Sequence, residues 1–240
     1  MEPAHSTTVR PKTIDHVALW VADRDSIADF LTRHVGMHVI ERTEAFTLVG
    51  ADARRFKLTL FAAEGPRERG VLAHVALRIG DLGRALRRVA PVVVDRSVGG
   101  EAYFDVSEGL RLGLVERETE LDYDLDHVAL YSATPEETAR KYLRLGFCEA
   151  RPGAAGAPRV EVNGGQLEFR RGEPGDGRRP LLNHLAVLVD SAEEHRLQAE
   201  SLGIEVADFV DAPNTLAVFV SGPERVKIEY VEHKPTFSLA

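Results

Sequence analysis

Leu125-Asp126-His127-Val128-Ala129-Leu130 reads as a short β-strand with one histidine, and the same pattern occurs three more times in the chain. The other copies are Ile14–Leu19 (IDHVAL), Leu72–Leu77 (LAHVAL) and Leu182–Val187 (LNHLAV). Their histidines, His16, His74, His127 and His184, are separated by 58, 53 and 57 residues. Self-similarity at such a period predicts four copies of one supersecondary unit.

Each histidine strand is followed by the same series of signals, which predicts one β-α-β-β-β unit in every repeat. A segment with helical periodicity comes next, then a glycine, then short alternating strands. In the fourth repeat Ser191 can cap the helix, with Glu194 three residues on, as in a capping box. The expected helices cover residues 23–34, 81–89, 134–145 and 191–200. The expected later strands cover residues 37–40, 46–49, 56–61, 92–94, 102–106, 110–115, 147–150, 159–162, 166–170, 204–207, 216–220 and 226–231.

The four units predict an α+β protein made of two tandem domains. Each domain would hold two βαβββ modules whose sheets form a curled, incomplete barrel around a cavity. We expect a disordered tail over residues 1–12, an N-terminal domain over residues 13–120 with modules 1 and 2, and a C-terminal domain over residues 121–240 with modules 3 and 4. The charged stretch Glu116–Tyr123 marks the boundary between the two domains.

Composition excludes several classes of protein. The formal net charge of −8 argues against nucleic acid as a partner, because phosphate contacts need a basic face. Cys148 is the single cysteine of the sequence, so no disulfide can form within the chain, which fits a cytoplasmic location. The first dozen residues lack the apolar run of a signal peptide, and no stretch approaches the ~18 apolar residues of a membrane span.

The last strand of each repeat carries a second candidate group. Lined up by apolar pattern, these strands place Thr59, Gly113, Glu168 and Glu229 at one equivalent position. Glu168 and Glu229 are flanked by apolar residues, and successive side chains of a strand point to opposite faces. Each glutamate is therefore expected to face away from the apolar layer.

Imidazoles and carboxylates that converge in a cavity form a ligand set for a divalent first-row metal. Two histidines and one carboxylate on one face are typical of non-haem Fe(II) oxygenases. The repeat makes convergence plausible, because equivalent positions of paired units meet across a pseudo-twofold axis. The alternative is a group of polar side chains that only hydrogen-bond to one another, but a buried carboxylate without a partner is costly.

The βαβββ unit, its x-[DN]-H-[VL]-A opening strand and its closing glutamate resemble the vicinal oxygen chelate superfamily. This superfamily includes glyoxalase I, bleomycin-resistance proteins, methylmalonyl-CoA epimerase and the type I extradiol ring-cleavage dioxygenases. The resemblance spans about Thr13 to Val231, and four modules in one chain look most like the extradiol dioxygenases. It implies a metal bound by His127, His184 and Glu229 in the C-terminal domain, with Fe(II) favoured over Mn, Zn, Ni or Co, and no metal in the N-terminal domain.

The resemblance also bears on Glu168, which holds the place of a fourth ligand in glyoxalase-like members. Glu168 could equally act as a catalytic base or pair with an arginine such as Arg170. Tyr131 and Tyr230 are candidates to donate a hydrogen bond to the substrate. Ring-cleavage enzymes often have a tyrosine in the closing segment where this chain has Phe219.

The remaining histidines are expected to have lesser roles. His16 and His74 lack a carboxylate in their own modules, which favours cavity histidines or substrate contacts over metal ligands. His195 lies in a charged helical segment and is expected to face solvent, and His233 is expected at the surface.

These features predict a metal-dependent enzyme, most consistent with a ring-cleavage dioxygenase that takes O2 and a small catechol-like substrate with vicinal oxygens. Two alternatives remain open. One is a glyoxalase- or epimerase-type lyase or isomerase at the same metal site, and the other is a non-catalytic resistance protein that binds a small molecule. A homodimer is a further expectation, because the fold often pairs through sheet edges.

Overall fold

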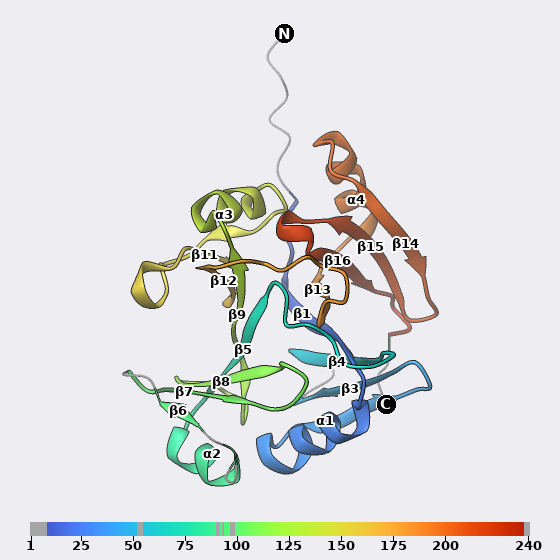
Figure 1. The fold of residues 1–240 in the computed structure, drawn as a ribbon. Coiled ribbons are helices and arrows are strands. Elements are labelled where there is room, and N and C mark those ends of the chain that lie inside the picture. The colour runs from blue at the N-terminus through green and yellow to red at the C-terminus, as the bar shows by residue number, and fades with distance from the viewer. Residues whose placement is uncertain (1–8, 52–54, 90–91, 93, 97–98, 238–240) are drawn as a thin grey trace.

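The computed structural model of the chain describes residues 9–51, 55–89, 92, 94–96 and 99–237 (Figure 1). Residues 1–8 of the expected tail and residue 93 of the expected strand 92–94 lie outside these described residues. Among the residues that the structure describes, no helix combines the length and the apolar character needed to cross a membrane.

Each module follows the expected order of one strand, one helix and three further strands. The helical elements are α1 (Arg24–Phe30), the π-helical turn η1 (Leu31–Val35), α2 (Leu82–Val89), α3 (Pro135–Leu143), α4 (Ala192–Ser201) and the short 3-10 turns η2 (Ala154–Gly156) and η3 (Pro223–Arg225). The strands are β1 (Thr13–Val21), β2 (His38–Arg42), β3 (Phe46–Gly50), β4 (Lys57–Ala62), β5 (Leu72–Ile79), β6 (Asp95–Arg96), β7 (Glu101–Asp105), β8 (Arg111–Glu116), β9 (Asp124–Ser132), β10 (Cys148–Glu149), β11 (Arg159–Val162), β12 (Gly165–Arg171), β13 (Leu182–Leu188), β14 (Val206–Asp211), β15 (Thr215–Ser221) and β16 (Lys227–His233). The prediction of an α+β chain of βαβββ modules is therefore confirmed.

The helices begin and end where local chemistry dictates. The Ser191 side chain accepts a hydrogen bond from the backbone N–H of Glu194 at the start of α4, which confirms the predicted cap. Pro135 stands in the first turn of α3, where its missing N–H costs nothing. The expected helix 23–34 splits into α1 and η1, and the latter ends at Gly36 with a φ of 96°, a backbone conformation that glycine adopts without steric cost.

The described residues form two eight-stranded mixed sheets, and each sheet joins one module from either half of the chain. The first sheet has the order β14-β15-β16-β13-β1-β4-β3-β2 and joins modules 4 and 1. The second has the order β10-β11-β12-β9-β5-β8-β7-β6 and joins modules 3 and 2. Histidine strands pair antiparallel at both junctions, β1 with β13 and β5 with β9.

The sheets do not follow the expected grouping of modules 1 and 2 and of modules 3 and 4, and the division of the chain into two tandem domains stays a prediction. Dividing the chain between residues 120 and 121 does not separate the two sheets, since each takes strands from both sides. The physical reason is that the four opening strands carry nearly the same apolar pattern, so any two can pair. The expected curling of each sheet around a cavity stays a prediction.

Alternation along the opening strands produces a core face and a site face. Val17 and Leu19 of β1, and Val128 and Leu130 of β9, are fully buried in the apolar core. Burying such a side chain contributes about 1.5–3 kcal/mol. Helices α3 and α4 lie at one end of the molecule and α1 and α2 at the opposite end (Figure 1). The histidines, which alternate with these core residues, are left for the other face.

Candidate metal centre

His16, His184 and Glu229 come together on the sheet formed by modules 1 and 4. They lie on β1, β13 and β16, and their ligand atoms all fall within 4.8 Å of one another. The Nε2 atoms of His16 and His184 are 3.1 Å apart, and the Oε2 atom of Glu229 lies 3.2 Å and 2.9 Å from them, respectively. Glu229 and His184 are buried, and His16 is half-buried.

The predicted ligand His127 lies in the other sheet. Its Nε2 atom is 2.9 Å from Nε2 of His74, in the same arrangement that His184 shares with His16. Two of the predicted ligands, His184 and Glu229, thus meet in the structure, and His16 takes the place that we expected for His127. The signal that could have identified His16 is the pairing of β1 with β13, which the local sequence does not encode.

The residue that precedes each histidine in sequence fixes the orientation of its imidazole. Nδ1 of His16 donates to Oδ1 of Asp15 at 2.7 Å, and Nδ1 of His184 donates to Oδ1 of Asn183 at 3.1 Å. Lys57 Nζ in turn donates to Oδ2 of Asp15 at 2.9 Å. A proton fixed on Nδ1 leaves Nε2 to face the site, the arrangement of metal-binding histidines.

The register of the strands shows which residue is equivalent to Glu229. Glu229 pairs with Ala186, two residues after His184, and Thr59 pairs with Ala18, two residues after His16. Thr59 therefore occupies, in module 1, the position of the carboxylate in module 4. This confirms the line-up of the closing strands made from the sequence, and it leaves the site with one carboxylate and two imidazoles.

The charges of the site are strongly coupled. Burial opposes ionisation of Glu229 and Asp15, yet the histidine nitrogens close to each carboxylate and, for Asp15, the charge of Lys57 keep both pKa values low, for Asp15 at about 2. Burial also disfavours the charged form of His16, but Asp15 and Glu229 raise the pKa of His16 to about 9. Burial lowers the pKa of His184 despite Glu229. The raised pKa of His16 favours its protonated form, whose positive charge lies beside Glu229.

These residues fit a divalent metal. Glu229 Oε2 is buried and makes no hydrogen bond of acceptable geometry with any group in the described part of the chain, although two Nε2 atoms lie close to it. A cation bound by these atoms would replace the proton of His16 and satisfy the carboxylate. Two imidazoles and one carboxylate suit Fe, Mn, Co, Ni or Zn.

A cavity of about 510 Å³ opens onto the three side chains. Four phenylalanines line it, and two of them, Phe61 and Phe219, place their rings 6.2 Å and 5.4 Å from the ring of His184. Phe46, Phe237 and the segment Ala212–Thr215 also line the cavity. This volume lies in the range of small-molecule sites.

His233 also lines this cavity, which corrects its expected place at the surface. Its Nε2 atom lies 3.5 Å from Oδ2 of Asp15, and its ring stacks on Phe237 with centroids 3.6 Å apart. His195 is corrected as well, because it is buried and packs against Tyr230 with ring centroids 4.5 Å apart. The charged residues of α4 lie around His195 in sequence, but its own side chain turns to the core.

The other predicted catalytic residues do not reach the triad. Glu168 and Tyr131 lie on β12 and β9 of the second sheet. Tyr230 is buried and its hydroxyl donates to the backbone oxygen of Leu145 at 2.9 Å, on the core side of β16. Hydrogen bonding to substrate by Tyr131 or Tyr230 stays a prediction that this geometry does not favour.

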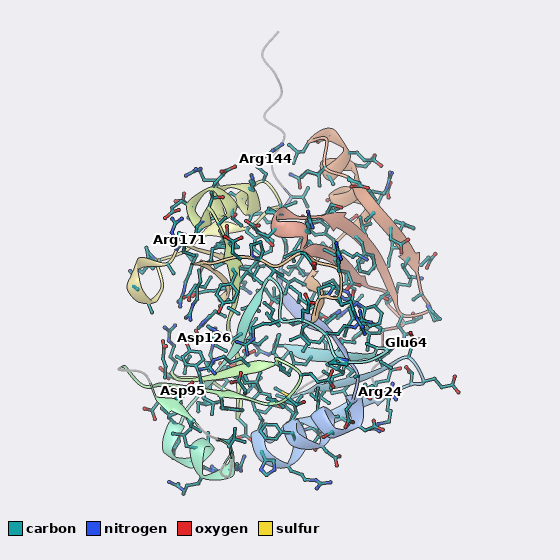
Figure 2. The ribbon with its side chains drawn as sticks, in the orientation of Figure 1. Arg24, Glu64, Asp95, Asp126, Arg144 and Arg171 are labelled. Carbon is teal, nitrogen blue, oxygen red and sulfur yellow. The ribbon has the colours of Figure 1, made fainter. Side chains whose placement is uncertain are left out.

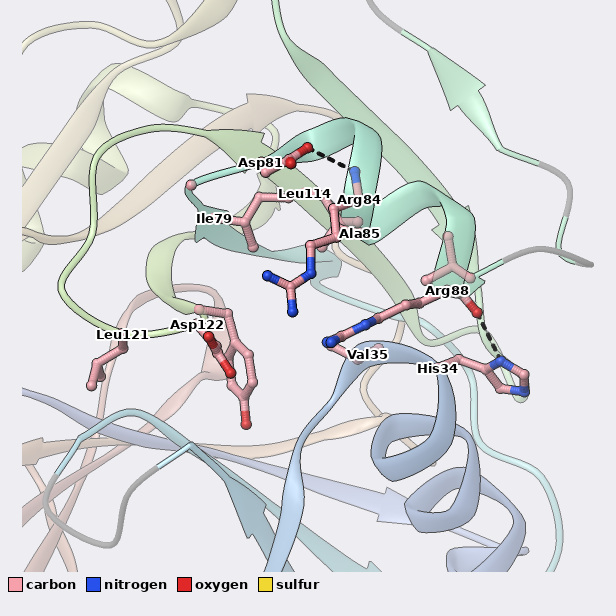
Figure 3. Close-up of a pocket in the computed structure, with 13 residues that line it drawn as sticks. His34, Val35, Ile79, Asp81, Arg84, Ala85, Arg88, Leu114, Leu121 and Asp122 are labelled. Atoms are coloured by element: carbon pink, nitrogen blue, oxygen red, sulfur yellow. Dashed lines mark hydrogen bonds between the residues drawn. The ribbon is translucent and has the colours of Figure 1, made fainter.

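A second cavity, of about 240 Å³, lies between η1 and α2 (Figure 3). Arg84 and Arg88 of α2 and His34 of η1 surround it, above an apolar floor that includes Ile79 and Leu114. None of the predicted site residues lines it, so the cavity beside His16, His184 and Glu229 is the better candidate for a functional site.

Comparison with known proteins agrees with this fold. Residues 13–91 match the model of the Glyoxalase/Bleomycin resistance protein/Dioxygenase superfamily. This match over about the first third of the chain agrees with the resemblance to vicinal oxygen chelate proteins. A comparison with curated proteins finds no match.

Solved structures share the fold over nearly the whole chain. Glyoxalase I from Zea mays matches with a TM-score of 0.77 and 17% identity, over 92% of this chain and 92% of its own. A candidate dioxygenase from Bacillus subtilis subsp. subtilis str. 168 matches with a TM-score of 0.75 and 18% identity, over 95% of this chain and 87% of its own. The cppA protein from Streptococcus pneumoniae TIGR4 matches with a TM-score of 0.61 and 15% identity, over 93% of this chain and 99% of its own. Identities this low establish the fold alone.

Proposed function

We propose that this protein is a metal-dependent ring-cleavage dioxygenase that acts on a small catechol-like substrate at the site of His16, His184 and Glu229. The observation that carries the proposal is the position of Thr59. It stands where a carboxylate would otherwise add a fourth ligand to the two histidines and Glu229. Three protein ligands leave coordination positions open, as the chelation of two substrate oxygens and the binding of O2 require.

The cavity supports an aromatic substrate. Phe46, Phe61 and Phe219 offer ring faces and edges, which prefer offset or edge-to-face contact with another ring. Among the described residues that line the cavity none is an arginine, and Lys57 is already engaged by Asp15. A substrate with several anionic groups would therefore find little compensation for its charge there.

The residues of the chain would position the substrate and handle its proton. When bound, a divalent metal supplies a Lewis acid that makes a chelated hydroxyl more acidic. The imidazole of His233 lines the cavity and is our candidate acceptor for that proton, and Asp15, 3.5 Å from its Nε2 atom, would stabilise the charge that it gains. Both oxygen atoms of O2 end in the ring-opened product, so the reaction needs no external reductant.

A proton-transfer reaction of the glyoxalase or epimerase type needs a carboxylate base at the site. Glu168, the predicted candidate, lies in the other sheet, and the equivalent position beside the triad is Thr59. Glu41 lines the cavity and is the carboxylate outside the triad and Asp15 that could serve. We therefore treat this reaction as the competing outcome of the test.

The test begins with protein stripped of metal and reloaded anaerobically with Fe(II) or Mn(II). We expect O2 uptake and a ring-fission product from simple catechols, and no product under nitrogen. His184→Ala should abolish both signals, while His127→Ala, in the second sheet, should retain them. Turnover of a hemithioacetal without O2 in the presence of Ni, Co or Zn would replace the proposal with the lyase. Ligand binding without any product would leave a binding protein.

A further inference from the structure

The second sheet contains another set of two histidines and one glutamate at the equivalent positions. Glu168 pairs with Ala129, two residues after His127, just as Glu229 pairs with Ala186, two residues after His184. The Nε2 atoms of His74 and His127 are 2.9 Å apart, and Nδ1 of His127 donates to Oδ1 of Asp126 at 2.7 Å. The strand register thus repeats the residue positions of the first set, although among the described residues only the first set brings all three ligand atoms within 4.8 Å of one another.

Two arginines donate hydrogen bonds to the glutamate of this second set. Arg159 Nε donates to Oε2 of Glu168 at 2.7 Å and its Nη2 to the same oxygen, while Arg170 Nε donates to Oε1 at 2.6 Å. Glu168 is fully buried, and the side chain of Arg159 is only 7% exposed. Both carboxylate oxygens are therefore engaged by guanidinium groups, and the pair with Arg159 lies where solvent screens it little. In the first set, by contrast, no arginine contacts Glu229 among the described residues.

Neighbouring groups fill the space that a bound ion and its substrate would need. Tyr103 packs on His74 with ring centroids 4.7 Å apart and covers Gly113, where a Cβ would lie 2.5 Å from Cε1 of Tyr103. Gly153 lies so close to Glu168 and Arg159 that a side chain there would collide with both. A divalent ion would add its charge beside the buried guanidinium of Arg159 and the half-buried one of Arg170, and this repulsion is strong at low dielectric.

We propose that the guanidinium of Arg159 takes the place of a metal ion in the set of His74, His127 and Glu168, and that removing it opens a second divalent-metal site. The unchanged protein then binds metal at the first set alone, although it carries two sets of ligands. Arg159 also joins β11 to β12 through Glu168 and Gln166, so it replaces the structural as well as the electrostatic role of an ion.

The test measures Co(II) or Mn(II) bound after dialysis, in a Glu229→Ala background that removes the first set. Arg159→Gln in this background should raise the metal content from near zero to about one per chain, and Co(II) should raise its melting temperature. Adding His127→Ala should abolish the gain. The matched control is Arg171→Gln. Arg171 follows Arg170 on β12 and lies at the surface with a 70% exposed side chain (Figure 2). This substitution should leave the metal content unchanged.

Two results would overturn the proposal. One is a folded Arg159→Gln variant, by circular dichroism, that gains no metal. The other is metal loss on His127→Ala in the otherwise unchanged protein, a measurement that stands even if Arg159→Gln fails to fold. The proposed function is tested separately. If the unchanged protein binds no metal while Arg159→Gln with Glu229→Ala does, the function fails and this inference holds.

Discussion

The Nε2 atoms of His16 and His184 lie 3.1 Å apart although 168 residues separate them in the chain. Their strands, β1 and β13, pair antiparallel and join the first module to the last. The candidate metal centre therefore depends on a contact between the two ends of the sequence. Any change that weakens this strand pair should also weaken the site.

His16→Ala should lower metal affinity more than about 100-fold, because one of three ligands is lost and the remaining two cannot enclose an ion. Isothermal titration with Mn(II) or Co(II) measures the effect. The matched control is His74→Ala, the same substitution at the equivalent position of module 2. Equal losses in the two variants would contradict the assignment of the site to the first sheet.

Asp15→Asn should lower metal affinity by about 10–100-fold, because Asp15 orients the imidazole of His16 through a 2.7 Å hydrogen bond. The substitution also leaves Lys57 buried without its carboxylate, which should cost about 3–5 kcal/mol of stability. The double variant Asp15→Asn with Lys57→Met separates the two effects. Urea unfolding should recover towards the unchanged protein, while metal affinity should stay low. Recovery of both would mean that Asp15 acts only through stability.

Thr59→Glu should restore a fourth ligand, because Thr59 is equivalent to Glu229 by register and lines the same cavity. We expect about tenfold or tighter binding of Zn or Co, and a loss of ring-cleavage activity of similar size, since an open coordination position is filled. Thr59→Val is the control, as it removes only the hydroxyl and should keep the metal. Unchanged oxygenase activity in Thr59→Glu would contradict the need for that position.

Glu168 should make the protein sensitive to acid. Burial favours its neutral form, but His127, Arg170 and Arg159 together hold the pKa of Glu168 below its usual 4.5. Its stabilising contribution is therefore complete above pH 4.5 and is lost as the pH falls through the lowered pKa of the folded state.

Glu168→Gln tests this dependence, because it leaves the two arginines without a charged partner at every pH. It should cost about 3–5 kcal/mol at neutral pH, and the difference from the unchanged protein should shrink in acid. Urea unfolding midpoints at neutral and acidic pH measure it. A difference that stays constant with pH would show that the Glu168 carboxylate does not titrate in this range.

Much of the architecture could be predicted from the four histidine strands. The period identified four βαβββ modules, the apolar alternation placed the histidines on one face, and the line-up of closing strands found the equivalent positions of Thr59 and Glu229. Two members of the triad, His184 and Glu229, could be predicted because they lie in one module and are linked by its internal strand order.

The pairing of modules could not be read from the sequence. The opening strands IDHVAL, LAHVAL, LDHVAL and LNHLAV are nearly interchangeable in apolar pattern, so local preferences do not select partners. The choice depends on the packing of whole modules around the core, which joins β1 to β13 and β5 to β9. That choice brought His16 into the site and moved His127 out of it.

The sequence by itself determined the modules, the histidine of each opening strand and the two candidate carboxylates, because these follow from periodicities of a few residues. Only the tertiary structure decided which histidines meet and which carboxylate remains available. Glu168 and Glu229 have the same local pattern, but of these two glutamates only Glu168 is contacted by Arg159 and Arg170. The reason is physical: a buried carboxylate takes its properties from the charges that folding places around it, and those come from side chains that a local pattern does not specify.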